Sequence, residues 1–225
     1  MKALKNLFNL LIVMTATTIL TFCSSPVESG EQNPANSDDL LYSMLDQTAL
    51  EDLSAGEKDG LIFMREEEKL ARDVYIVLYE KWNRRVFNNI SQSEQRHTNA
   101  VLYLINRYGI NDPVSDDGVG VFTNPDLQNL YNQLTDQGTA SLEEALKVGA
   151  AIEEIDILDL DKQLNEVIDN EDIKIVYENL RNGSYNHLRA FVRNLSAIGV
   201  NYSQQYLPKD EFDKIINGSN THGNG

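Results

Sequence analysis

The chain carries carboxylates and histidines at spacings that suit metal binding. Glu94 and His97 are three residues apart, so on a helix their side chains project from the same side. Glu68, Glu153 and His187 stand among apolar residues at helical spacing in three other segments. A buried carboxylate is strongly unfavourable unless it is paired or bound to a cation, and carboxylate and imidazole groups suit iron, manganese and zinc. These residues therefore predict a buried metal site.

Four helices must position these groups. In four segments the apolar residues alternate spacings of three and four, which predicts helices that each bury one face. Ser54 and Glu57 form a capping box at the start of the first helix. Ser141 caps the third helix, with Glu144 three residues on, and the second is expected to start near Ser91. The four faces are Leu61, Met64, Glu68, Ala71, Tyr75, Leu78 and Trp82; Ile90, Glu94, His97, Val101, Leu104 and Tyr108; Leu142, Leu146, Gly149, Glu153, Asp156, Leu160 and Leu164; and Ile173, Tyr177, Leu180, Ser184, His187, Phe191 and Ile198.

A long connection, residues 109–138, separates the second and third helices. It holds turn signals at 111–113 and 116–118 and a short amphipathic piece at 126–134. Such a length favours a crossover along a bundle over a tight hairpin. The sequence therefore predicts an all-α fold, a four-helix bundle with a long crossover between helices 2 and 3.

The predicted ligands follow a known plan. Bundles that hold two irons or manganeses use a Glu from each of two helices and Glu-x-x-His from each of the other two. Taken singly, each Glu is more readily a solvated helix residue and each His an ordinary core histidine. Their joint placement favours a metal site. The predicted metal ligands are Glu68, Glu94, His97, Glu153, Asp156 and His187.

Adjacent acids leave two choices open. Glu67 competes with Glu68, and Glu154 competes with Glu153. The acids that do not bind metal are expected to be solvated or to hydrogen-bond to a histidine. Two iron ions are the favoured occupants, and manganese or zinc suits the same groups.

The composition limits the partners. The chain has 225 residues, 41% of them apolar, and a net charge of -16. Such an acidic protein repels nucleic acid and anionic membrane surfaces, so both are excluded as main partners. The expected partners are metal ions and a small oxidant such as peroxide or oxygen, and a homodimer is among the assemblies that the sequence allows.

The N-terminus reads as an export signal. Lys2 and Lys5 precede an apolar run over 7–22, and the single cysteine, Cys23, follows it directly. This position resembles the lipid-modified cysteine of bacterial lipoproteins, although Phe22 stands where that pattern has a small residue. An ordinary cleaved signal or an uncleaved anchor is the alternative. The prediction is a bacterial, exported, membrane-anchored lipoprotein of the cell envelope.

Four ordered segments resemble a bacterial and archaeal domain family of unknown function that is grouped with the ferritin-like superfamily. They read EEEKLARDVY at 66–75, SEQRH at 93–97, GAAIEEIDI at 149–157 and GSYNHLRAF at 183–191. The resemblance implies a ferritin-like four-helix domain.

The expected domain boundaries follow from the resemblance and from composition. Residues 1–23 are the signal segment, 24–52 a flexible linker with a short helix near 40–53, 53–207 the ferritin-like domain, and 208–225 a C-terminal segment with a polar tail.

The chain is also distantly similar to rubrerythrin. There a glutamate precedes Ala-Arg-x-x-Tyr on the first helix, as Glu68 precedes 71–75 here. The second helix has Glu-x-x-His, as at 94–97, and the third has carboxylates three apart, as Glu153 and Asp156 are. Our first hypothesis is a di-iron centre bridged by Glu68 and Glu153.

Two departures bear on what such a centre does. The fourth helix of rubrerythrin has a ligand carboxylate at or near the position of Ser184. In this chain that carboxylate is absent, so His187 is the ligand-type residue of its helix face. No Cys-x-x-Cys pair is present, so electrons must come from elsewhere. The resemblance implies a di-iron oxidoreductase of the ferroxidase or peroxidase type. The alternatives are an asymmetric or weaker site and a non-catalytic metal-binding or partner-docking module.

Overall fold

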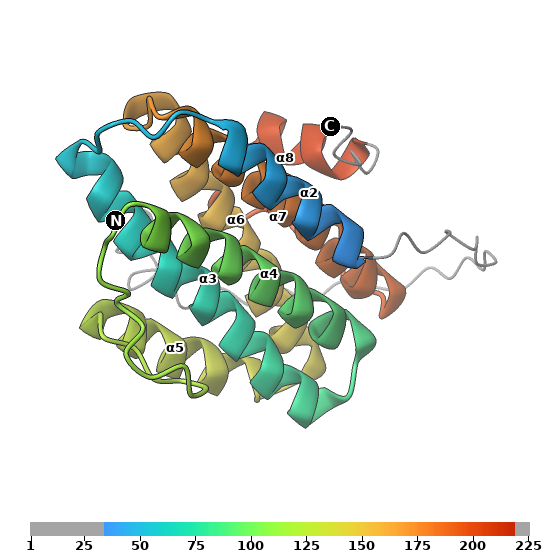
Figure 1. Cartoon of the computed structure of the whole chain (residues 1–225). Coiled ribbons are helices and arrows are strands. Elements are labelled where there is room, and N and C mark those ends of the chain that lie inside the picture. Colours follow the sequence, from blue (N-terminus) through green and yellow to red (C-terminus); the bar gives the residue numbers. More distant parts are fainter. Residues whose placement is uncertain (1–33, 219–225) are drawn as a thin grey trace.

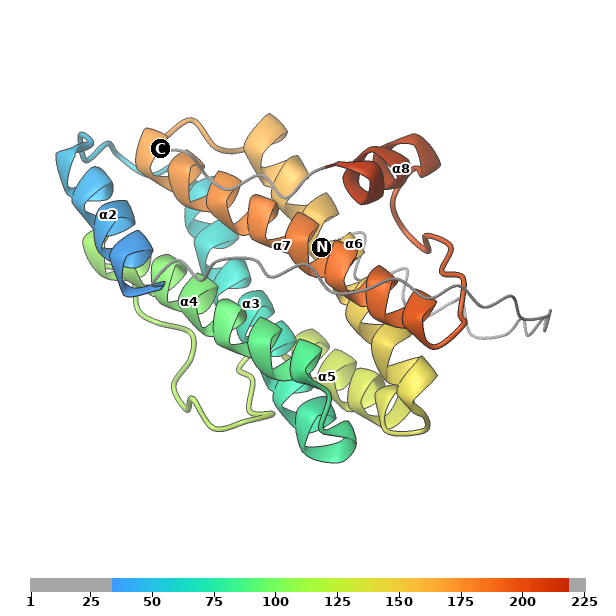
Figure 2. The same cartoon turned by 90° about the vertical axis from the view of Figure 1, so that its right-hand side faces the viewer.

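The computed structural model describes residues 34–218, and within them the chain forms seven helices and no strand. The helices are α2 (Pro34–Gln47), α3 (Ala55–Trp82), α4 (Arg85–Arg107), α5 (Pro125–Gly138), α6 (Leu142–Glu166), α7 (Glu171–Ala197) and α8 (Lys209–Asn217). The most extensive packing is between α3 and α4 and between α6 and α7. Figures 1 and 2 show these two pairs running alongside each other, with α5 against the side of α3.

Local capping explains where the long helices begin. Ser54 accepts a hydrogen bond from the Glu57 N–H, and the Glu57 carboxylate accepts one from the Ser54 N–H, so the predicted capping box is present. At α6, Ser141 accepts from the Glu144 N–H at 3.1 Å. The helix α4 begins before the predicted Ser91, at Arg85, so only residues 83 and 84 join it to α3.

The core consists of two apolar clusters separated by a polar layer. One cluster includes Tyr75 of α3, Phe87 of α4 and Phe191 of α7. The other includes Leu61 of α3 and Val101 of α4. The predicted ligands lie near the middle of the long helices: Glu68, Glu94, His97, Glu153, Asp156 and His187. On α3, α4 and α7 they separate residues of the two clusters, whereas on α6 Glu153 and Asp156 alternate with isoleucines of the first cluster. The fold therefore buries these groups at mid-height, with apolar packing on both sides.

Shorter helices cover the long ones. The connection over 109–138 contains α5, which is longer than the amphipathic piece at 126–134 and packs against α3 and α6. The helix α2 begins and ends earlier than the predicted 40–53, and its Leu45 is fully buried in the second apolar cluster. In the described part of the chain, no helix has the length and apolarity needed to cross a membrane.

Candidate metal centre

Glu94 lies at the middle of the polar layer, between two imidazoles. Its Oε2 is 2.8 Å from Nδ1 of His97, and its Oε1 is 2.8 Å from Nδ1 of His187. The two rings stack with centroids 5.5 Å apart. One carboxylate from α4 therefore contacts a histidine on its own helix and a histidine on α7.

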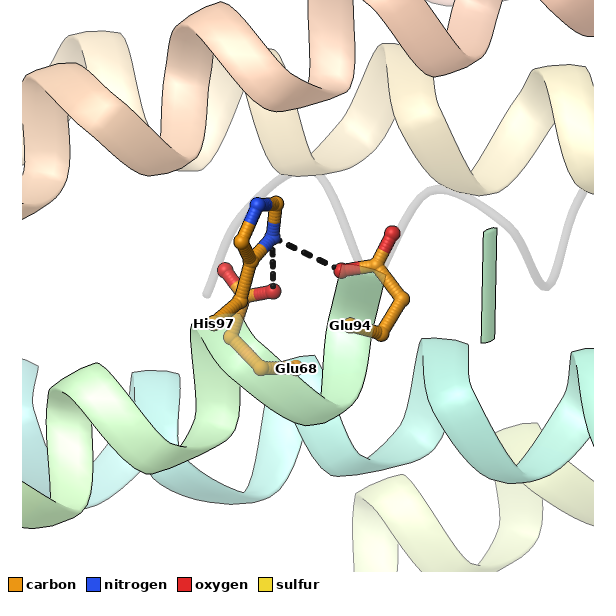
Figure 3. Close-up of side chains that lie close together, drawn as sticks. All are labelled: Glu68, Glu94 and His97. Atoms are coloured by element: carbon orange, nitrogen blue, oxygen red, sulfur yellow. Dashed lines mark hydrogen bonds and ion pairs between the residues drawn. The ribbon is translucent and has the colours of Figure 1, made fainter. Parts of the chain in front are cut away.

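Two further carboxylates complete two groups that each have metal-site dimensions. Glu68 Oε2 is 3.2 Å from His97 Nδ1, and Figure 3 shows this imidazole turned toward both glutamates. On the other side, Glu153 Oε2 is 3.3 Å from His187 Nδ1. In each group, one ligand atom per residue lies within 4.8 Å of the others. Glu94 is common to both groups, whereas the sequence suggested bridging by Glu68 and Glu153.

Burial and charge set the protonation of the centre. Burial raises the pKa of Glu68 to about 8, against the opposing effect of His97. Burial also acts to raise the pKa of Glu94, but the two imidazoles outweigh it and hold that pKa below its ordinary value. Burial lowers the pKa of His187, and Glu94 and Glu153 outweigh it and raise the value to about 9. Metal binding requires neutral imidazoles, so a metal ion would compete with the protonation that these raised pKa values favour.

Tyr75 supports the centre from α3. Its hydroxyl donates a hydrogen bond of 2.6 Å to Oε1 of Glu153, and its ring packs on Phe191 with centroids 5.2 Å apart. The hydroxyl thereby fixes one oxygen of Glu153, while the other oxygen faces His187. The sequence places Tyr75 near the predicted ligands, where core packing is the favoured role and hydrogen-bond donation the alternative; the structure shows both.

Asp156 is the one predicted ligand that lies outside both groups. Its Oδ2 accepts a hydrogen bond from the hydroxyl of Ser184, whose oxygen also lies 3.0 Å from the Leu180 carbonyl oxygen. The neighbouring Gly183 leaves room for a ring, since a Cβ there would lie 2.6 Å from Nε2 of His97. The resemblance places a ligand carboxylate in this part of the fourth helix. This chain instead has Ser184, which hydrogen-bonds to Asp156, and Gly183, which leaves space for the His97 ring.

Three consecutive glutamates on α3 point in three directions. Glu66 accepts hydrogen bonds from the N–H groups of Thr123 and Asn124, at 2.5 and 3.1 Å, and so holds the start of α5. Glu67 lines a cavity under α5. Only Glu68 faces the histidines.

Glu153 and Glu154 also differ in their partners. Glu154 accepts hydrogen bonds of 2.7–2.9 Å from the N–H groups of 205–207, and one of 2.7 Å from the Tyr202 hydroxyl. Its charge is therefore used to hold the segment that leads to α8. Glu153 alone faces the centre.

A second charged face of α3 was not anticipated. Lys69 is fully buried and pairs with Asp73 at 2.5 Å, while Arg72 pairs with Asp117 at 2.9 Å. Asp73 also accepts from the Gly120 N–H at 2.9 Å. These bonds fasten the crossover loop to the outer side of α3. The cue in the sequence is the run of charges at spacings of three and four beside the apolar stripe.

The centre has both imidazoles and three of the four carboxylates of the two-metal plan. Three buried carboxylates and two imidazoles converge, and Oε1 of Glu68 is buried without a hydrogen-bond partner in the described structure. Oxygen and nitrogen donors of this kind suit iron, manganese or zinc. The residues therefore fit the metal centre that the ferritin-like resemblance implies.

The chain is similar to an archaeal protein of known structure. It is 56% identical over 171 residues to the uncharacterized protein MJ0754 of Methanocaldococcus jannaschii. This alignment covers 76% of this chain and 92% of the relative. The crystal structure of hypothetical protein MJ0754 superposes with a TM-score of 0.75 at 55% identity, over 76% of this chain and 98% of that one. The match supports the helical fold.

These comparisons overturn the prediction of a bacterial envelope lipoprotein. The matched relative is archaeal, and the matched region takes up nearly all of that relative. The residues on which the prediction rested, including Cys23, lie outside the described range. Reading a bacterial lipoprotein signal from a short apolar run and one cysteine was wrong, because such a pattern is too brief to specify an organism or a compartment.

The family comparison covers the structured part of the chain. The model of the family described as "Uncharacterized protein domain (DUF2202)" matches residues 57–219, from the first turn of α3 to just beyond α8. All six predicted ligands fall inside that range. This chain belongs to the DUF2202 family.

Proposed function

We propose that this chain is a ferritin-like protein that holds two metal ions. The helices α3, α4, α6 and α7 form its four-helix bundle, and the connection through α5 is the crossover. One ion lies among Glu68, Glu94 and His97, and the other among Glu94, Glu153 and His187. The observation that supports this most is the position of Glu94, whose two oxygens each face a different histidine at 2.8 Å.

Iron is the proposed metal, and it would supply redox chemistry toward peroxide, oxygen or ferrous iron. The protein's part is to orient the ligands and exclude water. Tyr75 fixes one oxygen of Glu153. The apolar clusters on both sides of the polar layer keep the centre dry, which strengthens each electrostatic contact.

Metal counting tests this proposal. The full chain, freed of metal and loaded with Fe²⁺ without oxygen, should bind about two ions per chain. Glu94→Gln should lose both, because Glu94 serves both groups. Glu166→Gln is the control, since Glu166 is exposed at the end of α6. Absence of bound metal in the wild-type protein would sink the proposal.

The second step is to add peroxide to the loaded protein and follow its loss. Turnover in the wild type and in Glu166→Gln, but not in Glu94→Gln, supports an oxidoreductase. Two bound irons with no turnover would support the metal centre but rule out the proposed enzymatic activity.

That second outcome corresponds to the alternative, a non-catalytic metal-binding or partner-docking module. Ser184 favours the alternative. It stands where the rubrerythrin-like pattern has a ligand carboxylate, and its hydroxyl donates a hydrogen bond to Asp156. If the function is partner docking, Glu94→Ala and His187→Ala should leave the cellular function intact. A loss of that function in either variant excludes partner docking.

A further inference from the structure

A groove lies between α4 and α7, at the end of the bundle where α4 begins and α7 ends (Figure 2). Its volume is about 570 Å³, which falls within the range of small-molecule sites. Its apolar lining consists of Val86, Ile90 and Ala190. Ile90 precedes Glu94 by four residues, and Ala190 follows His187 by three, so the groove lies about one helical turn from the metal centre.

The rest of the lining is polar or basic and includes no carboxylate: Asn83, Arg84, Arg85, Asn89 and Asn194. Arg84 and Arg85 are exposed, and within residues 34–218 neither guanidinium has a hydrogen bond or an ion pair. Elsewhere in the chain, four arginines each pair with an aspartate: Arg65, Arg72, Arg107 and Arg181. The chain has 35 acidic residues and 19 basic ones, so a groove with two unpaired guanidinium groups reverses the overall charge locally and attracts anions.

The tight turn between α3 and α4 places the two arginines. Asn83 ends α3 with a φ of 48°, a left-handed conformation that asparagine adopts more readily than most residues. Its N–H donates to the Tyr79 carbonyl at 2.8 Å, which fixes the backbone of the turn. Arg84 and Arg85 follow directly, so a rigid backbone presents both guanidinium groups on one side of the groove while α7 forms the other.

The lining combines three kinds of contact. Guanidinium groups bind phosphate through paired hydrogen bonds, and two of them match its double negative charge. The side chains of Asn83 and Asn89 have no hydrogen-bond partner in the described residues, and an amide both donates to and accepts from hydroxyl groups. Asn194 donates to the Ala190 carbonyl at 2.9 Å and keeps its own side-chain oxygen as an acceptor. The groove is too large for a phosphate group alone, and its apolar lining suits a carbon skeleton.

We propose that this groove binds a small phosphate ester. The phosphate group lies against Arg84 and Arg85, and the hydroxyl-bearing part of the ligand lies along the asparagines and the apolar lining. The site goes beyond the two-ion centre, with which it shares no residue. A net charge of -16 repels extended polyanions, so the ligand is a small molecule rather than a nucleic acid.

Calorimetric titration of the full, metal-free chain at low ionic strength tests the site. The probes are inorganic phosphate, glycerol 3-phosphate, ribose 5-phosphate and AMP. At least one ester should bind about tenfold more tightly than inorganic phosphate, because the asparagines and the apolar lining contact the organic part. The double variant Arg84→Gln/Arg85→Gln should bind that ester at least about tenfold more weakly than the wild type.

The matched control is Arg96→Gln. It removes the same charge from the same helix, and the Arg96 side chain bonds only to Gln92 and Ser93 of that helix, so ester binding should be unchanged. Arg84 and Arg85 are exposed and unpaired, so the double variant should melt at the wild-type temperature. Glu94→Gln should bind the ester as the wild type does, which separates this site from the metal centre.

Five results would overturn the inference. The groove is not an anion site if neither phosphate nor any ester binds, and it is only a patch of charge if all four probes bind equally. Undiminished binding in the double variant places the ligand elsewhere. An equal loss in Arg96→Gln means that binding follows net charge alone. Retention of the chain by phosphatidylglycerol vesicles, lost in the double variant, would assign the arginines to a lipid surface.

Discussion

Two kinds of buried glutamate stand side by side in this chain. Glu66 and Glu154 accept hydrogen bonds from backbone N–H groups of returning loops, and Glu57 does the same for residues 169 and 170. We call these three the clamp glutamates. Their neighbours Glu68 and Glu153 face imidazoles instead. Adjacent residues of one type therefore serve opposite purposes.

The difference lies in what surrounds the charge. A peptide N–H is a fixed, neutral donor, and two or more of them stabilise a buried carboxylate without a cation. The glutamates of the centre have few such donors, and they lie close enough together to repel one another. The clamp glutamates should therefore govern folding stability, and the centre glutamates should govern metal binding.

The largest expected effect comes from breaking a clamp. Glu154→Ala leaves the N–H groups of 205–207 without their acceptor, so the free energy of unfolding should fall by about 3–5 kcal/mol. Urea unfolding of the metal-free protein measures this change. The matched control is the adjacent Glu153→Gln, which should lose metal affinity but change the metal-free stability far less. If Glu153→Gln destabilises the protein as much as Glu154→Ala, the division into two kinds is mistaken.

The next effect concerns the centre. Metal at about one hundred times its dissociation constant should stabilise the wild type by about 2.7 kcal/mol per site, because it binds the folded chain. Glu94→Gln should show no metal-dependent increase in stability. Glu66→Ala, once folded, should be stabilised by metal as the wild type is. Thermal melts with and without Fe²⁺ and a chelator decide this, and a metal-dependent rise in Glu94→Gln would contradict it.

The periodicity of the sequence located the long helices because each buries one face along its whole length. The stripes containing Glu68 and Glu94 correspond to α3 and α4, and those containing Glu153 and His187 correspond to α6 and α7. The same stripes named the residues that gather around Glu94. What helical spacing conveys is therefore the side of a helix on which a residue lies.

The spacing could not convey which acid in a run has which partner. Glu154 differs from Glu153 because it binds the N–H of Gln205, in a later loop. Glu66 differs from Glu68 because it binds the N–H of Asn124, at the start of α5. Those partners are long-range contacts and leave no local pattern. The role of Ser184 was missed for the same reason, since its partner, Asp156, lies on another helix.

A smaller effect is expected where α7 makes room for the centre. In Gly183→Ala the added Cβ would meet the His97 ring at 2.6 Å, so the ring must shift from its contacts with Glu68 and Glu94. Metal affinity should fall on the order of tenfold, a loss typical of disturbing a ligand's support. Stability should change little, because alanine favours the helix by about 1 kcal/mol while the contact opposes it. Calorimetric metal titration beside urea unfolding tests both parts, and unchanged affinity would count against the assigned role of His97.

The smallest expected effect distinguishes two buried tyrosines. Tyr75→Phe removes the donor to Glu153 and should cost about 1 kcal/mol of stability. Tyr177 is equally buried, but its hydroxyl has no hydrogen-bond partner in the described structure, so Tyr177→Phe should be neutral or stabilising. Metal affinity should fall in the first variant and not in the second, because only Tyr75 orients a ligand. Equal effects of the two substitutions would mean that both rings act through packing alone, and that Glu153 needs no donor to face His187.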